Sequence, residues 1–142
     1  MEHSHEELPR LAESIIEQTA EAIIYADRGG IIRRWNRAAA SMFGYPAAEA
    51  IGKSLDLIIP ERLRAAHWRG FDAAVANGAT RLHGHPTLTR AEHPSGKKLY
   101  VEMSFTLVTD TTGTVQGSVA VARDVTERVE REQAAAQGYA AG

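Results

Sequence analysis

The sequence contains no cysteine. This absence excludes disulfide bonds, thiolate metal sites, iron–sulfur clusters and cysteine nucleophiles, since all of them need a thiol. An excess of one charge is also lacking, because sixteen basic and eighteen acidic residues give a formal net charge of −2. A nucleic-acid-binding domain would be strongly basic. We therefore expect no nucleic-acid partner.

Long hydrophobic runs are missing too. No apolar stretch reaches the roughly 20 residues that a membrane-spanning helix needs. The first residues, M-E-H-S-H-E-E, are acidic and do not resemble a basic signal leader. We therefore expect a cytoplasmic protein with no membrane contact. Its 142 residues, of which 44% are hydrophobic, suffice for one domain with its own core.

Motifs that would indicate catalysis are absent. The sequence has no glycine-rich phosphate loop, no G-x-S-x-G elbow and no H-E-x-x-H pair. The carboxylates are spread over faces that we expect to be solvated. The chain is therefore predicted not to be an enzyme, and any kinase or cyclase output would lie outside it.

The first half of the chain predicts a helix, a hairpin and short helical segments. Apolar residues at steps of three and four predict the N-terminal helix; they include Leu8, Leu11, Ala12, Ile15 and Ile16. Two strand-like segments, 22–26 and 31–35, flank the turn sequence D-R-G-G. Asn36 is a predicted N-cap for a helix over 37–43, which Gly44 ends. A helical turn over 46–50 and an apolar connector over 55–60 follow.

The second half predicts a long helix, three strands and a final helix. The long helix covers 61–76 and ends at Asn77-Gly78. The first strand, around 80–90, contains Gly84 and Pro86 and should be an irregular edge strand. From Thr126 the chain is again helical, and the last five residues are expected to be disordered.

The two remaining strands show clean alternation. One face of the first should carry the apolar residues Leu99, Val101, Met103, Phe105 and Leu107. One face of the last strand should carry Val115, Val119, Val121 and Val125. The expected class is α+β, with one five-stranded antiparallel sheet and helices on one face. Its parts are an N-terminal flanking helix (1–20), the domain itself (21–126) and a C-terminal linker helix with a disordered tail (127–142).

The histidines are the candidate functional residues. His67 lies on the apolar face of the long helix, where an unpaired imidazole would cost about 1–3 kcal/mol. Its partner could be a backbone carbonyl, a carboxylate or a metal, and helix geometry by itself favours a hydrogen-bonded core or boundary histidine. His83 and His85 share one face of a strand and could chelate a metal, although an exposed strand face is the simpler interpretation. Trp35 is expected in the core, and Trp68 in surface packing.

Four segments in fixed order resemble PAS domains, from about residue 15 to residue 128. They are G-I-I-R-R-W-N-R-A-A (30–39), M-F-G-Y-P-A-A-E-A-I-G-K (42–53), G-K-K-L-Y-V-E-M-S-F (96–105) and A-R-D-V-T-E-R (122–128). The resemblance implies the PAS fold, in which helices cover a pocket on a five-stranded antiparallel sheet. The photoactive flavin and coumaroyl subgroups need a cysteine and are therefore excluded.

One subgroup is closer. The segment P-E-R-L-R-A-A-H-W-R-G-F (60–71) is similar to the helix of the rhizobial oxygen-sensor haem PAS domains, which implies haem b with His67 as its proximal iron ligand. Thr87 stands where those sensors have a distal arginine, so their ligand preference does not transfer. Distal hydrogen bonding would then come from His83 or His85, or be absent. The other pocket residues implied are Leu63, Phe71, Met103, Phe105, Val119 and Val121.

The resulting hypothesis is a cytoplasmic sensor of a two-component type of system. It would detect a diatomic gas or a redox change and relay it through the C-terminal helix to a downstream signalling module. A homodimer through the N-terminal helix is the expected assembly. The alternative is a cofactor-free PAS module for dimerisation and relay, or one that binds an unknown small organic ligand.

Overall fold

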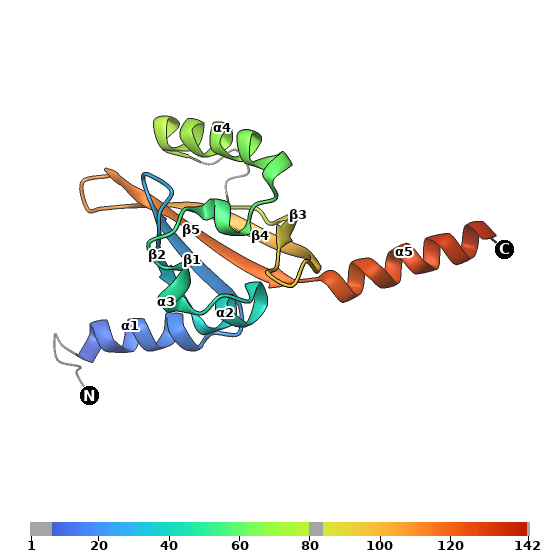
Figure 1. The fold of residues 1–142 in the computed structure, drawn as a ribbon. Coiled ribbons are helices and arrows are strands. Elements are labelled where there is room, and N and C mark those ends of the chain that lie inside the picture. Colours follow the sequence, from blue (N-terminus) through green and yellow to red (C-terminus); the bar gives the residue numbers. More distant parts are fainter. Residues whose placement is uncertain (1–6, 80–83, 142) are drawn as a thin grey trace.

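The computed structural model describes residues 7–79 and 84–141. Figure 1 shows an antiparallel sheet with helices packed around it and a long helix leaving it at the C-terminus, which confirms the predicted α+β class. The elements are, in order, α1 (Glu7–Gln18), β1 (Ala22–Asp27), β2 (Ile32–Trp35), α2 (Arg37–Phe43), α3 (Ala47–Ala50), the 3₁₀ helix η1 (Leu55–Ile58), α4 (Glu61–Asn77), β3 (Thr87–Glu92), β4 (Lys98–Thr109), β5 (Val115–Asp124) and α5 (Thr126–Ala141).

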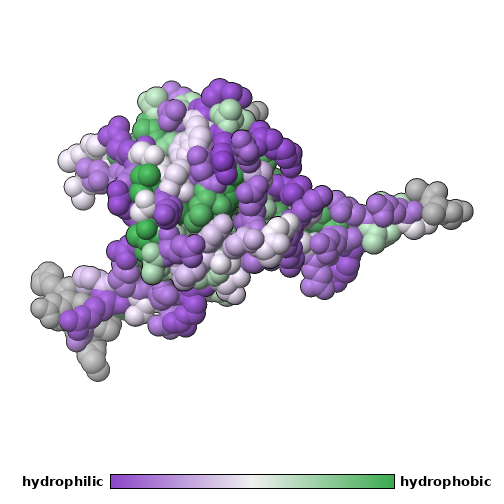
Figure 2. Space-filling view, in the orientation of Figure 1, coloured by the Kyte–Doolittle hydropathy of each residue, from purple (hydrophilic) through white to green (hydrophobic). Residues whose placement is uncertain are grey.

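The sheet has the strand order β2-β1-β5-β4-β3, and every pair is antiparallel. The N-terminal hairpin therefore joins the C-terminal strands at the β1–β5 pair. In that register Ala120 on β5 lies between Ile24 on β1 and Phe105 on β4. One row of side chains thus crosses the middle of the inner face of the sheet. Apolar residues show on the viewed face below α4, bordered by hydrophilic ones (Figure 2).

The inner face of β4 is the one that the alternation predicts, because Leu99, Val101 and Met103 are buried. On β5 Val119 and Val121 share one face, as predicted, but it is not the inner face that their implied place in the pocket requires. The residues buried on this strand include Ser118, Ala120 and Ala122, whereas Val119 and Val121 alternate with them and stay half-buried on the other face. Alternation identifies two faces of a strand but not which of them faces inward. Here the small side chains are the ones that face the core.

Two boundaries differ from the sequence prediction. The strand predicted around 80–90 begins only at Thr87, directly after Pro86, and pairs with β4 alone as the sheet edge. Residues 80–83 lie outside the described part of the chain. The C-terminal helix continues through Gly138 to Ala141, so the expected disordered tail is helical over these positions.

Asn36 connects three elements through four hydrogen bonds. Its side-chain oxygen accepts from the backbone N–H of Ala39 (3.0 Å), which confirms the predicted N-cap of α2, and from that of Ile23 on β1 (2.9 Å). Its Nδ2 donates to the carbonyl oxygens of Ile16 (2.8 Å) and Glu21 (3.0 Å). The side chain is buried; its hydrogen bond with Ala39 is buried as well, and the other three are partly buried.

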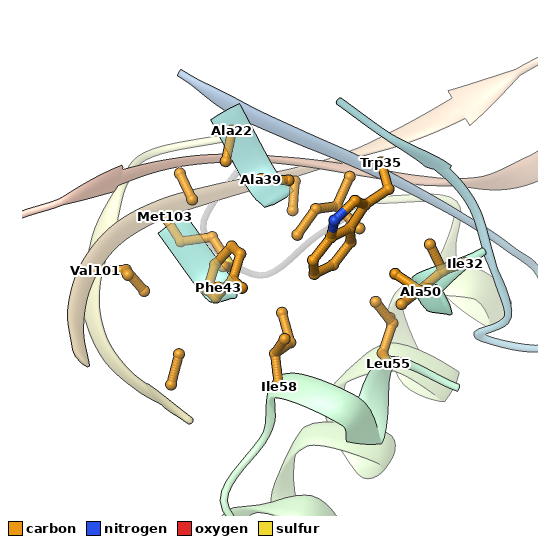
Figure 3. Packing of buried hydrophobic residues seen from close by; sticks show 14 of the residues in the cluster. Ala22, Ile32, Trp35, Ala39, Phe43, Ala50, Leu55, Ile58, Val101 and Met103 are labelled. Atoms are coloured by element: carbon orange, nitrogen blue, oxygen red, sulfur yellow. The ribbon is translucent and has the colours of Figure 1, made fainter. Parts of the chain in front are cut away.

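The best-packed part of the core lies between the sheet and the short helices. Trp35 and Phe43 pack against each other with ring centroids 5.6 Å apart, near Ile32, Leu55 and Ile58 (Figure 3). The indole N–H of Trp35 donates to the carbonyl oxygen of Tyr45 (2.8 Å). The prediction that Trp35 is a core residue is confirmed, since it is 3% exposed.

Helix α4 is held differently. It has 17 residues, yet Phe71 is its one buried residue. In Figure 1 α4 lies at the top and α1 and α2 lie at the bottom, with the strands between them, and η1 leads into α4. A helix that buries so little of its surface leaves space between itself and the sheet, and that space is the candidate functional site.

We predict that Asn36→Ala lowers the free energy of unfolding by about 2–4 kcal/mol, because it leaves four buried or partly buried backbone groups without the side chain that pairs with them. Urea unfolding checks this through a lower midpoint at an unchanged m-value. Asn77→Ala, at the exposed end of α4, is the matched control and should change stability by less than about 0.5 kcal/mol. Equal midpoints for the two variants would contradict the role given to Asn36.

Candidate functional site

A cavity of about 490 Å³ lies between α4, η1 and the inner face of the sheet. This volume is within the range of small-molecule pockets, about 300–1,000 Å³. The lining is mostly apolar: Ile24, Leu55, Ile58, Ile59, Leu63, Ala66, Phe71, Ala74, Ala91, Met103, Phe105, Leu107 and Ala120. Gly70 also lines it, and a Cβ added there would meet no atom within 4 Å.

The polar lining is small and carries no carboxylate among the described residues. It consists of His67, Thr87, Thr89, Arg90 and Ser118. An apolar chamber with a few hydroxyls and basic groups suits a ligand with an apolar body. The absence of acidic lining side chains in the described chain means that a ligand bearing carboxylates would meet no like charge there.

His67 projects from α4 into this cavity. Its ring is surrounded by aromatic rings, with centroid distances of 4.7 Å to Trp68, 6.1 Å to Phe71 and 6.2 Å to Phe105. Its Nδ1 is buried and has no hydrogen-bond partner among the described residues. A buried nitrogen without a hydrogen-bond partner destabilises the folded state. The imidazole would therefore gain from binding a polar group or a metal that enters the cavity.

Burial lowers the pKa of His67, and the nearby carboxylates of Asp56 and Asp72 offset this only in part. The imidazole is therefore neutral at neutral pH, because its usual value is already 6.5. A neutral imidazole can give a nitrogen lone pair to a metal, whereas the protonated form cannot.

Six residues predicted from the sequence line this cavity. They are Leu63, His67, Phe71, Thr87, Met103 and Phe105. Three come from α4, one from the edge strand β3 and two from β4. The structure thus brings together side chains from both walls, and their role in binding stays a prediction.

Three other predicted residues are placed differently. Val119 and Val121 do not line the cavity, because they lie on the face of β5 opposite to Ser118 and Ala120. His85 is exposed and outside the lining, since the strand that was to carry it starts at Thr87. His83 lies outside the described residues.

The wall contributed by η1 was not predicted from the sequence, and on the edge strand Thr87 was predicted but Thr89 was not. Leu55, Ile58 and Ile59 lie in a segment that the sequence marked only as an apolar connector. Thr89 faces inward because it pairs with Val101, as Thr87 pairs with Met103. Pairing the two strands by their alternation would have indicated Thr89 beside the predicted Thr87.

Trp68 also differs from its prediction of surface packing. Its indole N–H donates to Asp56 Oδ1 (2.7 Å), and its ring lies against Gly30 in the β1–β2 turn. It packs at the edge of the hydrophobic core. Both contacts reach far along the chain, so no local pattern could indicate them.

Three features of the residues present are compatible with a haem group: an apolar cavity in the size range of small-molecule pockets, a neutral imidazole in its lining, and a buried ring nitrogen without a partner among the described residues. Within residues 7–79 and 84–141, no three His, Asp or Glu side chains are grouped to hold a bare metal ion. Haem needs no such group, since the porphyrin supplies four nitrogens and the protein only the axial ligation.

A five-stranded antiparallel sheet with a helix-covered pocket defines a class of small ligand-binding modules. The chain matches the family described as PAS fold over residues 16–130, and it therefore belongs to the PAS family. It is a sensory signalling domain of that family. In the described part of the chain, no helix combines the length and apolar character needed to cross a membrane.

Three individual proteins are similar to this chain. The chain is 26% identical over 122 residues to the oxygen sensor protein DosP of Escherichia coli, which covers 83% of this chain and 15% of DosP. The PAS domain of a Colwellia psychrerythraea protein has a TM-score of 0.73 at 19% identity, covering 84% of this chain and 98% of that one. An RNA-binding light-oxygen-voltage receptor has a TM-score of 0.74 at 26% identity, covering 96% of this chain and 38% of that one.

The lowered pKa of His67 gives a pH prediction. The folded protein binds a proton at His67 less readily than the unfolded chain, whose pKa is 6.5. The stability that the neutral imidazole contributes is therefore fully present above pH 6.5, and it is lost as the pH falls below 6.5 through the lowered pKa of the folded state. We expect His67→Gln to lose less unfolding free energy than wild type between about pH 7.5 and about pH 5.5. Urea unfolding at several pH values measures this. His85→Gln, at an exposed position, should follow the wild-type profile, and a parallel His67→Gln profile would refute the assignment.

Proposed function

We propose that this PAS domain binds haem b with His67 as the axial protein ligand and uses it to sense a diatomic gas or a redox change. The observation that carries the proposal is the neutral, half-buried imidazole of His67, which lines an apolar cavity and whose buried Nδ1 has no hydrogen-bond partner among the described residues. The similarity to DosP, whose name describes an oxygen sensor, supports it. Bound haem would supply an iron atom that takes a gas ligand or changes oxidation state.

The protein's own part is to hold and shield the group. Leu63 and Phe71 would contact it from α4, and Met103 and Phe105 from β4, so apolar side chains would exclude water from both sides. Thr87 and Thr89 offer the hydroxyl groups on the edge strand. No described histidine other than His67 lines the cavity, so hydrogen bonding to a bound gas would differ from that expected with a distal histidine.

The relay would run through β4 into α5. On β4, Met103 lines the cavity, whereas Tyr100 and Glu102 contact the start of the C-terminal helix. The N–H of Tyr100 donates to Thr126 Oγ1 (2.9 Å), and its carbonyl accepts from the N–H of Val125 (2.8 Å). A ligand that favours one position of β4 would therefore bias the direction of α5, and with it a downstream signalling module.

The test is reconstitution of the purified protein with hemin, followed by visible spectroscopy. Wild type should give a sharp Soret band, and His67→Ala should lose it while circular dichroism shows an intact fold. His85→Ala is the matched control, because it removes an exposed imidazole next to the cavity-lining edge strand, and it should keep the band. No band in wild type, or a band indifferent to His67→Ala, would leave a cofactor-free relay module or a small organic ligand as the function.

We further propose that α1 pairs with α1 of a second copy. Leu8, Leu11 and Ile15 form one stripe of this helix and are 51%, 45% and 60% exposed, and no residue of α1 is buried. The helix is joined to its own domain at its other face and its end, through the Glu13–Arg34 ion pair and the Asn36–Ile16 hydrogen bond. A self-complementary apolar stripe is well suited to a two-fold interface.

We expect Leu11→Glu combined with Ile15→Glu to convert a dimer to a monomer, since the charges would lie in the apolar contact. Size-exclusion chromatography with light scattering measures the mass directly. Arg10→Glu adds negative charge to the same helix outside the stripe and should leave the mass of the dimer unchanged. A wild-type protein that is monomeric at every concentration would rule the interface out.

A further inference from the structure

Trp68 stands next to His67 on α4, and both rings contact Phe71, but the other neighbours of Trp68 differ from those of His67. Because α4 buries only Phe71, packing against the sheet does little to fix its position. We propose that Trp68 is a positioning residue, which sets where α4 holds His67 over the cavity. The proposal deepens the function proposed above where it concerns the ligand, but the contacts of Trp68 exist without any ligand.

The indole of Trp68 joins α4 to two other elements. Its N–H donates to Asp56 Oδ1 in η1 at 2.7 Å. Its six-membered ring covers Gly30 so closely that a Cβ there would lie 2.2 Å from Cη2 and 2.4 Å from Cζ3. Gly30 has φ +78° and so already favours glycine. This turn therefore accommodates the ring of Trp68 against bare backbone.

Arg64, one helical turn before Trp68, strengthens the same attachment. Its Nε donates to the carbonyl oxygen of Ile59 (3.0 Å), and its NH2 group donates to that of Asp56 (3.2 Å). Residues at i and i+4 lie on one face of a helix, so Arg64 and Trp68 both attach the same face of α4 to the η1 segment. One face of α4 is thus attached to η1, and the face about 100° away carries His67.

The two faces are mechanically coupled because the rings of His67 and Trp68 touch, with centroids 4.7 Å apart at 79°. Loss of the Trp68 contacts would let α4 move away from η1 and admit water to the cavity. A ligand that moves His67 would act on Trp68 first. Regulation of the site would therefore depend on the Trp68–Asp56 hydrogen bond as well as on the imidazole.

Trp68→Phe in the ligand-free protein tests this, because it removes the N–H donor and keeps an aromatic ring. We expect the amides of α4 to exchange with deuterium up to about tenfold faster, the range that one lost hydrogen bond allows. Amides of β4 and β5 serve as the internal reference and should not change. Arg69→Gln, the exposed neighbour on α4, is the control and should exchange like wild type. The proposal is overturned if exchange becomes faster by the same factor throughout the domain, or if exchange in α4 does not become faster.

A second readout separates positioning from general destabilisation. In folded Trp68→Phe, the pKa of His67 measured by NMR should rise toward 6.5 as water reaches the ring. The charged groups that face or border it are Asp56, Asp72 and Arg90. None of them is substituted in this variant, but Asp56, which raises the pKa of His67, loses its hydrogen bond from Trp68. An unchanged pKa of His67 would show that Trp68 does not control its surroundings.

Asp56→Ala removes the acceptor of the same hydrogen bond, and it can replace Trp68→Phe if that variant does not fold. Asp56 also forms an ion pair with Arg64 (3.9 Å), so Asp56→Ala has an effect of its own. If Trp68 and Asp56 act through one hydrogen bond, the acceleration of exchange in α4 in the double variant should be smaller than the sum of the two single effects. Additive acceleration overturns the coupling.

Hemin binding is scored separately, so the two proposals can fail independently. Wild type without a Soret band but with the exchange and pKa changes in Trp68→Phe removes haem and keeps the positioning role. A normal Soret band in wild type, together with unchanged exchange and an unchanged pKa of His67 in Trp68→Phe, keeps haem and removes the positioning role.

Discussion

The structure depends on Asn36, whose four hydrogen bonds lie where three elements meet. They fix the end of α1 to the start of β1 and the start of α2 to the hairpin. Because β1 pairs with β5, this junction also sets the plane on which the C-terminal strands assemble. A buried amide with both its donor and acceptor groups satisfied specifies one arrangement, whereas apolar packing alone would tolerate several. The inner face of the sheet, and thus one wall of the cavity, is fixed from this point.

The domain is divided into a firmly packed half and a loosely held one. Near Asn36, rings such as Trp35 and Phe43 are almost fully buried. At the other end α4 is held by a few side-chain contacts around Asp56 and covers a cavity instead of a packed core. Segments with few buried contacts open at lower free energy than the core. A sensor needs such a division, since a ligand can shift only an element whose alternative positions are close in free energy.

The sequence was informative where the signals are local. The D-R-G-G turn, the Asn36 cap, the end of α2 at Gly44 and the alternation of β4 each involve residues close in the chain, and each is confirmed. Of the cavity, the sequence identified His67 and its neighbours on α4 and β4. It failed where the outcome depends on distant partners: the face of β5 is set by the strands on both sides, and Trp68 is placed by Asp56 and Gly30.

The small residues on the inner face of β5 help to explain why a cavity exists. Had the valines faced inward, their side chains would have projected between Ile24 and Phe105, where Ala120 now leaves room. Gly70 does the same from α4, since it faces the cavity with no side chain and no atom lies near its missing Cβ. Small residues on both walls leave the space between helix and sheet unfilled, and each forgoes the apolar burial that a larger side chain would contribute. That sacrifice of packing is consistent with space kept for a ligand, because such an opening does nothing to stabilise the empty domain.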